Sequence, residues 1–341
     1  MKKSVLPILL TLGVVACSAP ATADGPSVTV TNCGQEVRFP APAAGMFVND
    51  GNMVSMVLSL GAQDSVAAVS SVQRDEQTLR RHYGDAVDEL TSVSTTYPSR
   101  ETVLAQDPDV MVAGWNYGYS EEKNITPASL RADGIAPYIL TESCRQEEGR
   151  SARGITEPWD ALRTDLTNLG TITGREDDAA RAVEDLDDRL AALAAAPKAE
   201  RPPVVFLFDS ATDTVFTSGR FGAPQAILDA AGAVNAVADL DDTWTAVSWE
   251  RVAAADPDAI VFVDYPPQTF AEKVALLQAR PGISELEAVR EQRFLNLPYA
   301  LWTSGPLNVD AAEQVREQLE AWGMVPPSNV SAEFDDSVGI E

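Results

Sequence analysis

The stretch Gly174–Pro203, GREDDAARAVEDLDDRLAALAAAPKAERPP, decides how the rest of the chain is organised. Apolar residues recur along it at the spacing of one helical face, acidic residues near its start favour a helix N-terminus, and Pro197 ends it. A helix of about 22 residues spans roughly 33 Å, which is about the diameter of a small domain. We therefore predict a helix over 174–200 that bridges two lobes. An ordinary surface helix of one larger α/β domain would show the same pattern.

A repeat on the two sides of this stretch favours two lobes. Ser99–Asp109, SRETVLAQDPD, precedes the apolar run VMVAGW, and Ser248–Asp258, SWERVAAADPD, precedes AIVFVDY, at a constant offset of 149 residues. Each copy is typical of a serine N-cap, a glutamate in the first turn, a short helix that ends before Asp-Pro, and a buried strand. The fold class is thus α/β. We predict similar α/β lobes at 27–173 and 201–325, with a ligand cleft between them and only small rocking about the helix.

The first residues have the form of an export signal. Lys2 and Lys3 precede the apolar run VLPILLTLGVV, which is too short for a comfortable membrane span, and small residues lead up to Cys17. The ending Val-Val-Ala-Cys resembles the lipobox of bacterial lipoproteins. That resemblance implies a signal peptide over 1–16, a diacylglyceryl group on Cys17, and a tether over 17–26 that holds the body at the outer face of a membrane.

Composition limits the possible partners. The chain has 341 residues and a formal charge of −26, so it should bind neither nucleic acid nor anionic lipid through its surface field. We expect a monomer. The Pro-rich, acidic residues 326–341 predict a disordered tail.

Two cysteines remain when Cys17 is set aside. Cys33 lies in TVTNCGQEVRFPAP, whose alternating pattern predicts a hairpin, and Cys144 lies near the end of the first lobe. Disulfides persist in exported proteins, so we predict a Cys33–Cys144 bond. Two buried free thiols are the alternative.

The sequence lacks the motifs of common enzyme classes. The single histidine, His82, lies in a charged stretch that suggests an exposed side chain, and no nucleophile elbow, P-loop or dinucleotide fingerprint is present. Transition-metal sites usually need several histidines or thiolates. We therefore expect no catalysis, no cofactor and no resident metal.

The lipobox, the two lobes, the bridging helix and the repeated phrases together resemble the substrate-binding lipoprotein of an ABC importer. The likeness covers about residues 27–325. Within this family, the sequence most resembles the class with a rigid interlobe helix that carries ferric siderophores, cobalamin or haem. In that family the first-turn glutamate of each lobe reaches an arginine of each permease subunit. Glu101 and Glu250 match those glutamates, so the resemblance implies docking to a permease dimer with its ATPase.

The residues themselves support this transfer. Two equivalent carboxylates on two equivalent lobes form a pseudo-two-fold pair, which suits a two-fold symmetric partner. A carboxylate in the first turn of a helix is also favoured for helix stability alone, so capping is the alternative role of Glu101 and Glu250.

Aromatic and arginine residues gather in loops where predicted strands end. In open α/β folds such loops line the ligand site, and rings beside guanidinium groups suit a large, flat, partly anionic ligand. We expect about half of the following set to line the cleft: Asn49, Asp50, Trp115, Tyr117, Tyr119, Arg153, Phe216, Arg220, Phe221, Trp244, Tyr265 and Trp302.

A ferric siderophore is the first choice of ligand, because it is the commonest cargo of the class. Cobalamin, another corrinoid or a deazaflavin precursor would use the same residues, and haem would need an axial ligand such as Tyr117 or a methionine. A two-lobed surface enzyme or adhesin is the alternative of another class. It leaves Glu101 and Glu250 without a role.

Overall fold

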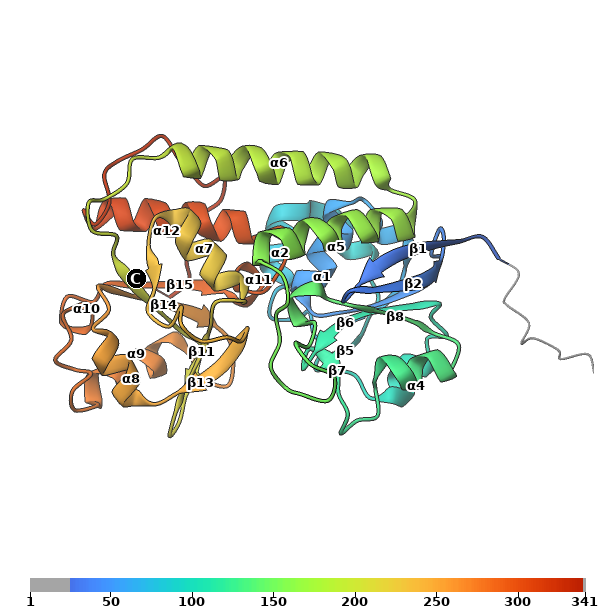
Figure 1. Ribbon diagram of the computed structural model, residues 1–341, viewed down its shortest axis with the longest axis horizontal. Coiled ribbons are helices and arrows are strands. Elements are labelled where there is room, and N and C mark those ends of the chain that lie inside the picture. Colours follow the sequence, from blue (N-terminus) through green and yellow to red (C-terminus); the bar gives the residue numbers. More distant parts are fainter. Residues whose placement is uncertain (1–24, 340–341) are drawn as a thin grey trace, which may run out of the picture.

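The computed structural model describes residues 25–339 and shows two α/β lobes side by side beneath one long helix (Figure 1). In the first lobe, parallel strands pair in the order β5-β4-β3-β6. Strand β8 pairs with the other edge of β6, and the short strand β7 pairs with the last two residues of β6. The elements are β3 (Met46–Asn49), α1 (Gly51–Ser59), β4 (Val66–Ser70), α2 (Glu76–Tyr83), β5 (Ser92–Ser94), α3 (Arg100–Leu104), β6 (Val110–Trp115), β7 (Gly118–Tyr119), α4 (Pro127–Ala132), β8 (Ala136–Ile139) and α5 (Pro158–Thr173).

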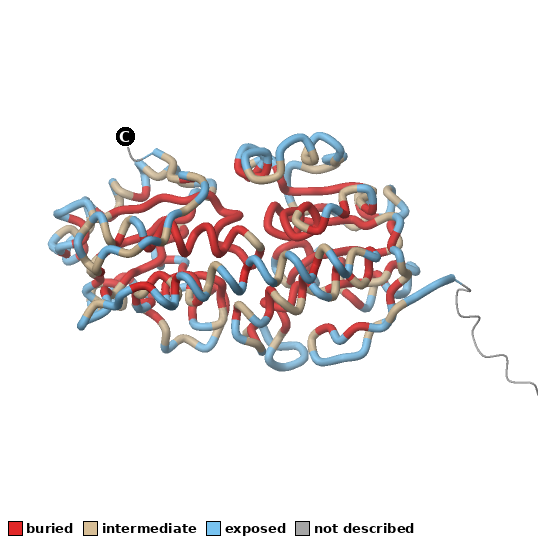
Figure 2. Tube along the Cα trace, turned by 90° about the horizontal axis from the view of Figure 1, so that it is seen from above, coloured by how far each residue is buried: buried red, intermediate tan, exposed pale blue. Residues whose placement is uncertain are grey.

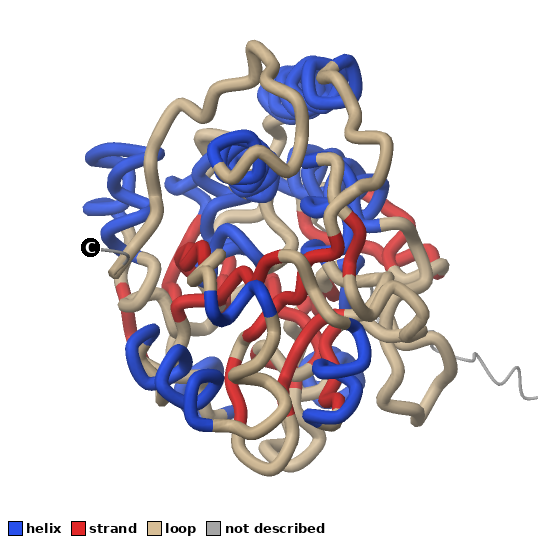
Figure 3. Tube along the Cα trace, turned by 90° about the vertical axis from the view of Figure 1, so that its left-hand side faces the viewer, coloured by secondary structure: helices blue, strands red, loops and turns tan. Residues whose placement is uncertain are grey.

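The second lobe repeats this plan with an added antiparallel sheet. Its parallel strands pair in the order β12-β9-β14-β15, and β10, β11 and β13 form the antiparallel sheet. Viewed from this lobe, helices lie above and below the strands (Figure 3). The elements are β9 (Val204–Phe208), β10 (Ser210–Ala211), β11 (Val215–Ser218), α7 (Ala223–Ala231), β12 (Val234–Asn235), β13 (Trp244–Val247), α8 (Trp249–Ala255), β14 (Ala259–Asp264), α9 (Phe270–Ala279), α10 (Glu287–Arg290), β15 (Phe294–Pro298), α11 (Tyr299–Trp302) and α12 (Asn308–Ala321).

The bridging helix is α6 (Glu176–Ala195). It packs against α5 of the first lobe and against α7 and α12 of the second. Ala179, Leu186 and Leu193 are buried along its inner face, whereas its outer face crosses the top of the molecule in contact with solvent (Figure 2). The prediction of one helix that joins two lobes is confirmed. Its start is later than predicted, because Gly174 has a φ of 68° and ends α5.

The serine that begins each copy of the repeat caps a helix. Ser99 caps α3 by accepting a hydrogen bond from Thr102 N, and Ser248 caps α8 by accepting one from Arg251 N, both at 3.2 Å. These bonds satisfy N–H groups that have no partner within the helix. The repeat therefore encodes the same helix start in both lobes.

The aspartate that closes each copy fastens the neighbouring strand. A carboxylate oxygen of Asp109 accepts a hydrogen bond from Gly45 N at 3.2 Å, just before β3, and Asp258 accepts one from Val204 N at 2.8 Å, at the start of β9. The main chain of each aspartate also donates to the same residue, at 2.9 Å and 2.7 Å. The second half of the repeat thus sets the register of the strand beside it.

The N-terminal hairpin is formed by β1 (Ser27–Asn32) and β2 (Gln35–Pro40), which pair antiparallel as predicted. Cys33 in its turn is disulfide-bonded to Cys144, as the sequence led us to expect. Asn32 adds a reciprocal pair of hydrogen bonds to the main chain of Ile139, at 2.7 and 2.9 Å. The hairpin is therefore attached to the end of β8. The predicted signal peptide, Cys17 and most of the tether lie outside the described residues.

The prediction of a disordered tail is wrong for the described residues Pro326–Gly339. This segment runs antiparallel to α12, with Ser328 bonded to Glu320 and Ala332 bonded to Glu317. The side chain of Asp336 further along is fully buried. The acidic composition misled the prediction, because several of these carboxylates and main-chain groups have specific partners.

We predict that Asp109→Ala and Asp258→Ala each lower the free energy of unfolding by about 1–3 kcal/mol, because each leaves a strand N–H without its acceptor. Urea denaturation followed by circular dichroism measures this loss. Asp213→Ala is the control, because Asp213 is exposed. A loss in the control as large as in the two variants would contradict this role for the repeat.

Candidate interlobe ligand site

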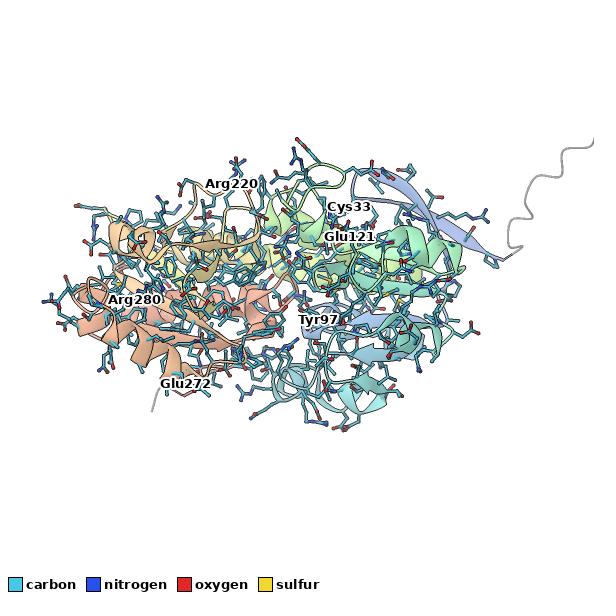
Figure 4. All side chains as sticks on the ribbon, turned by 90° about the horizontal axis from the view of Figure 1, so that it is seen from below. Cys33, Tyr97, Glu121, Arg220, Glu272 and Arg280 are labelled. Carbon is cyan, nitrogen blue, oxygen red and sulfur yellow. A yellow bond between two sulfur atoms is a disulfide. The ribbon has the colours of Figure 1, made fainter. Side chains whose placement is uncertain are left out.

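The carboxyl ends of parallel strands from the two lobes meet at Asp50. Its carboxylate follows β3, is fully buried, and accepts hydrogen bonds from Tyr97 at 3.0 Å and from Tyr299 of the second lobe at 3.1 Å. Arg74 donates to the other oxygen at 2.6 Å. The Arg74 guanidinium also lies 4.6 Å from the ring centre of Tyr265 and 4.8 Å from that of Tyr299. One first-lobe ion pair therefore contacts two second-lobe aromatic residues. From below, Tyr97 is seen where the lobes meet (Figure 4).

Two further first-lobe carboxylates hold the second-lobe segment that begins with α11. Asp75 accepts a hydrogen bond from Ala300 N, and Glu142 accepts one from Ser304 N, both at 3.1 Å. Asn52 donates to Ser304 O at 2.8 Å. All of these side chains are buried. The segment is thus fastened to the first lobe by hydrogen bonds to its main chain.

Burial shifts the pKa of these carboxyl groups. Desolvation raises the pKa of Asp75 to about 8, helped by repulsion from Asp50, and raises the pKa of Glu142 to about 7 against the attraction of Arg153. Desolvation also raises the pKa of Asp50, although Arg74 and the tyrosine hydroxyls oppose the shift. A buried charge is costly. In the folded protein these carboxyl groups therefore keep protons at pH values where exposed carboxyl groups would release them.

Arg153 makes the third contact between the lobes. Its guanidinium donates to Trp115 O at 3.2 Å and to Trp244 O at 2.9 Å, and its main-chain N–H donates to Asp242 at 3.1 Å. The next residue, Gly154, lies so close to Phe221 that a Cβ there would be 2.2 Å from the Phe221 Cβ. The loop that ends the first lobe is therefore fitted against the β11–β13 region.

Several buried polar atoms at this boundary have no hydrogen-bond partner. Those of the first lobe are Asn52 Oδ1, Arg74 Nε, Asp75 Oδ2, Tyr117 Oη, Glu142 Oε1 and Arg153 Nε, and those of the second are Thr243 Oγ1, Trp244 Nε1 and Ser304 Oγ. A buried polar group without a partner costs about 1–3 kcal/mol. Tyr117 lies near Thr243 and Glu142 lies near Trp244, so small shifts of the lobes would pair these groups with each other. In the present arrangement they can instead bond to polar groups of a bound molecule or to ordered water.

The structure brings about half of the predicted cleft residues to the lobe boundary. Asp50, Tyr117, Arg153, Phe221, Trp244 and Tyr265 lie there. Phe216 is beside them, with its ring stacked 6.1 Å from that of Trp244 and 38% of its surface exposed. Arg220 is half exposed and pairs with Asp241 in the same lobe.

Trp115 faces another region of the first lobe. Its ring lies 3.6 Å beneath the Arg145 guanidinium and lines a cavity of about 520 Å³ beside the N-terminal hairpin. Only its carbonyl oxygen takes part in the lobe contact, through Arg153.

Three predicted cleft residues belong instead to the interior of one lobe. Asn49 links the ends of β4 and β7, since it accepts from Ser70 Oγ and donates to Tyr117 O. The hydroxyl of Tyr119 donates to the main chain of β6 and β8. The indole of Trp302 donates to the main chain of β14. The prediction that they line the cleft is wrong, because their polar atoms complete the hydrogen bonding of their own lobe.

The sequence analysis missed several boundary residues, namely Arg74, Asp75, Tyr97, Glu142, Thr243, Tyr299 and Ser304. Most of them follow strands closely, so the rule that chose the predicted set could have found them. His82, expected at the surface, is buried, with only 6% of its side chain exposed.

Glu101 and Glu250 are exposed on α3 and α8. The pKa of each is lowered by its own backbone N–H and by the hydroxyl of the capping serine, Ser99 or Ser248. Each helix leads into a parallel strand, so its N-terminus lies toward the carboxyl-end edge of the sheet. The two carboxylates are therefore exposed, favoured in the charged form, and in the same position of the repeat on each lobe.

Comparison with known proteins agrees with this arrangement. The sequence of residues 49–301 matches the family described as periplasmic binding protein. The chain belongs to the periplasmic binding protein family. Its members bind solutes and carry out no catalysis.

Among residues 25–339, no cluster of three or more His, Cys, Asp or Glu side chains could hold a metal ion, and no helix is long and apolar enough to cross a membrane.

Relatives within the family bind different solutes. The cobalamin-binding protein of Halobacterium salinarum is 28% identical over 254 residues, which are 72% of this chain and 59% of that protein, so this chain spans about three fifths of its length. A periplasmic binding protein from Veillonella parvula superposes with a TM-score of 0.70 at 25% identity, covering 87% of this chain and 99% of that one. An ABC-type Fe³⁺-hydroxamate transport system from Saccharomonospora viridis gives 0.69 at 25% identity, covering 86% and 98%.

We predict that Asp75→Asn with Glu142→Gln reduces the loss of stability on raising the pH from about 5.5 to about 8.5. In the wild type both carboxyl groups have raised pKa values, so the folded state binds more protons than the unfolded state. The contribution of these two groups to stability is therefore fully present below their unfolded pKa values and is lost as the pH rises through about 7 to 8.

Urea denaturation at a series of pH values measures this difference. Glu272→Gln is the control, because Glu272 is exposed and its pKa is lowered, so it should leave the slope in this range unchanged. Identical slopes for the double variant and the wild type would show that these carboxyls do not carry the pH dependence.

Proposed function

We propose that this chain is the extracytoplasmic solute-binding component of an ABC importer, which captures a ferric siderophore of the hydroxamate type and delivers it to a permease. The proposal is supported by membership of the periplasmic binding protein family and by the likeness to the Fe³⁺-hydroxamate system of Saccharomonospora viridis. The export signal and Cys17 fit a body that is lipid-anchored at the outer face of the membrane.

The contacts of the boundary arginines indicate which ligand charge the site would favour. Arg74 is paired with Asp50 and covered by aromatic rings, and Arg153 is bonded to the main chain of both lobes. Arg220 is paired with Asp241. Each of these guanidinium groups has at least one such partner, although Nε of Arg74 and Nε of Arg153 donate no hydrogen bond. The chain as a whole carries a formal charge of −26. An anionic ligand would meet few unpaired cations among these residues, so we favour an uncharged ligand over a partly anionic one.

An uncharged chelate suits the boundary better. Three hydroxamates neutralise Fe³⁺, whereas three catecholates leave the complex with a net negative charge. The hydroxyl groups of Tyr117, Thr243 and Ser304 and the indole N–H of Trp244 are neutral donors at the boundary that can hydrogen-bond to amide and hydroxamate oxygens. The Phe216 and Trp244 rings add apolar contact. This internal use of the arginines is the observation that carries the proposed ligand class.

A corrinoid is the second candidate, because the matching relative from Halobacterium salinarum is a cobalamin-binding protein. Cobalamin is also large and bears peripheral amides, so the same neutral polar atoms would serve it.

Tryptophan quenching distinguishes these ligands, because Trp244 lies at the lobe boundary. The purified protein is titrated with a ferric trihydroxamate, a ferric tricatecholate, cyanocobalamin and haemin. We expect saturable quenching by the trihydroxamate and none by the tricatecholate. Binding of cyanocobalamin alone would replace the siderophore with the corrinoid, and preference for the tricatecholate would refute the argument from charge.

We also propose that Glu101 and Glu250 dock onto the two subunits of the permease. Glu101→Lys with Glu250→Lys should reduce uptake by more than about tenfold, because reversed charges repel the partner's arginines. Ligand affinity of the purified variant should stay unchanged, since both side chains are exposed.

Uptake by cells that depend on the importer measures the effect. Glu76→Lys with Glu272→Lys is a matched control, because these are exposed first-turn glutamates, one on each lobe, outside the repeat. Equal loss of uptake in the control, or loss of ligand binding in the docking variant, would refute the docking role.

A further inference from the structure

The C-terminal segment Pro326–Gly339 reaches from the second lobe to the first. It leaves α12, turns back along that helix, and brings Asp336 against α2 of the first lobe. Arg81 donates to the Asp336 carboxylate at 2.7 Å and to Asp335 O at 2.6 Å. The His82 ring lies 3.0 Å from the other carboxylate oxygen and packs edge-on against Phe334, with the ring centres 4.6 Å apart.

The same segment is held to the second lobe on both sides of these contacts. Before them, Ser328 bonds to Glu320 of α12 at 2.7 Å. After them, Val338 exchanges main-chain and side-chain hydrogen bonds with Asn296 of β15, at 3.1 and 2.9 Å. Gln314 also exchanges hydrogen bonds with Asp336, at 2.9 and 3.2 Å. Asp336 must therefore move with the second lobe, while its ion pair belongs to the first.

A cavity of about 370 Å³ lies next to this contact. Its walls come from α1 and α2 of the first lobe, from α6, from the start of α12, and from Glu333 and Phe334 of the segment. A void lined by both lobes leaves space for them to shift against each other. The segment closes one side of that space.

We propose that Pro326–Gly339 is a strap that limits how far the two lobes part. A single bridging helix resists bending but permits rocking of the bodies at its ends. Opening the lobes would pull Asp336 away from Arg81 and His82. The Asp336 carboxylate is fully buried and bonded to both first-lobe side chains, so opening would exchange several charged hydrogen bonds at once for bonds to water, at a net cost in free energy. The strap thus adds a second connection between the lobes on the side of α6.

The strap goes beyond the proposed function, and its test needs no ligand. Spin labels are placed at Glu101→Cys and Glu250→Cys, one exposed position on each lobe, in the full chain carrying Cys17→Ser. Cys33 and Cys144 are bonded to each other and should not react with the label. Double electron–electron resonance then gives the distribution of distances between the two labels in the ligand-free protein.

We expect Asp336→Asn and Arg81→Met each to broaden the distribution and shift it to longer distances. The two changes together should do little more than either alone, because both remove the same contact. A chain that ends at Val325 should show the largest shift. If truncation prevents folding, the two point variants still decide the question.

Arg293→Met is the matched control, because its ion pair with Glu287 lies within the second lobe and outside the segment. It should lower stability without changing the interlobe distances. Unchanged distributions in the Asp336 and Arg81 variants, or equal broadening in the control, would overturn the proposal.

Discussion

The packing of α6 against both lobes is the constraint on which the rest of the structure depends. Its buried stripe contacts α5 on one side and α7 and α12 on the other, so neither lobe is placed independently of it. The approach to α5 is so close that a Cβ on Gly170 would be 2.5 Å from the Ala179 Cβ. Arg189 adds ion pairs to Asp310 and Glu313 of α12. The helix therefore sets the distance between the lobes, and other contacts set their angle.

Those other contacts combine an apolar core that continues through both lobes with a polar boundary. Around the boundary, first-lobe carboxylates bond to a tyrosine hydroxyl and to main-chain N–H groups of the second lobe, and Arg153 bonds to carbonyl oxygens of both. Hydrogen bonds can be exchanged for bonds to water or ligand at modest net cost, whereas an apolar core cannot open without exposing its surface. The polar part of the boundary can therefore open more readily than the apolar core that joins the lobes.

Local signals in the sequence were sufficient for much of the fold. Ser99 and Ser248 start helices, the hairpin turn holds Cys33, and the apolar spacing of α6 identified the bridge. These features depend on neighbours a few residues apart, so a periodic pattern or a cap reports them. The exposed positions of Glu101 and Glu250 follow from the same helix starts.

The site depended on contacts between distant residues. Position after a strand led to Asp50, which lies at the lobe boundary, but it could not tell that Tyr119 and Trp302 turn into their own lobes. Asp50 and Tyr299 are 249 residues apart, and nothing near either one indicates the bond between them.

The sequence by itself therefore determined the two lobes, the helix that joins them and the repeated helix starts, because short-range spacing encodes all three. Only the tertiary structure decided which side chains face the lobe boundary, that Arg74 and Arg153 are already paired, and that the acidic tail is ordered. The physical reason is that burial and ion pairing are set by which surfaces meet when the chain has folded.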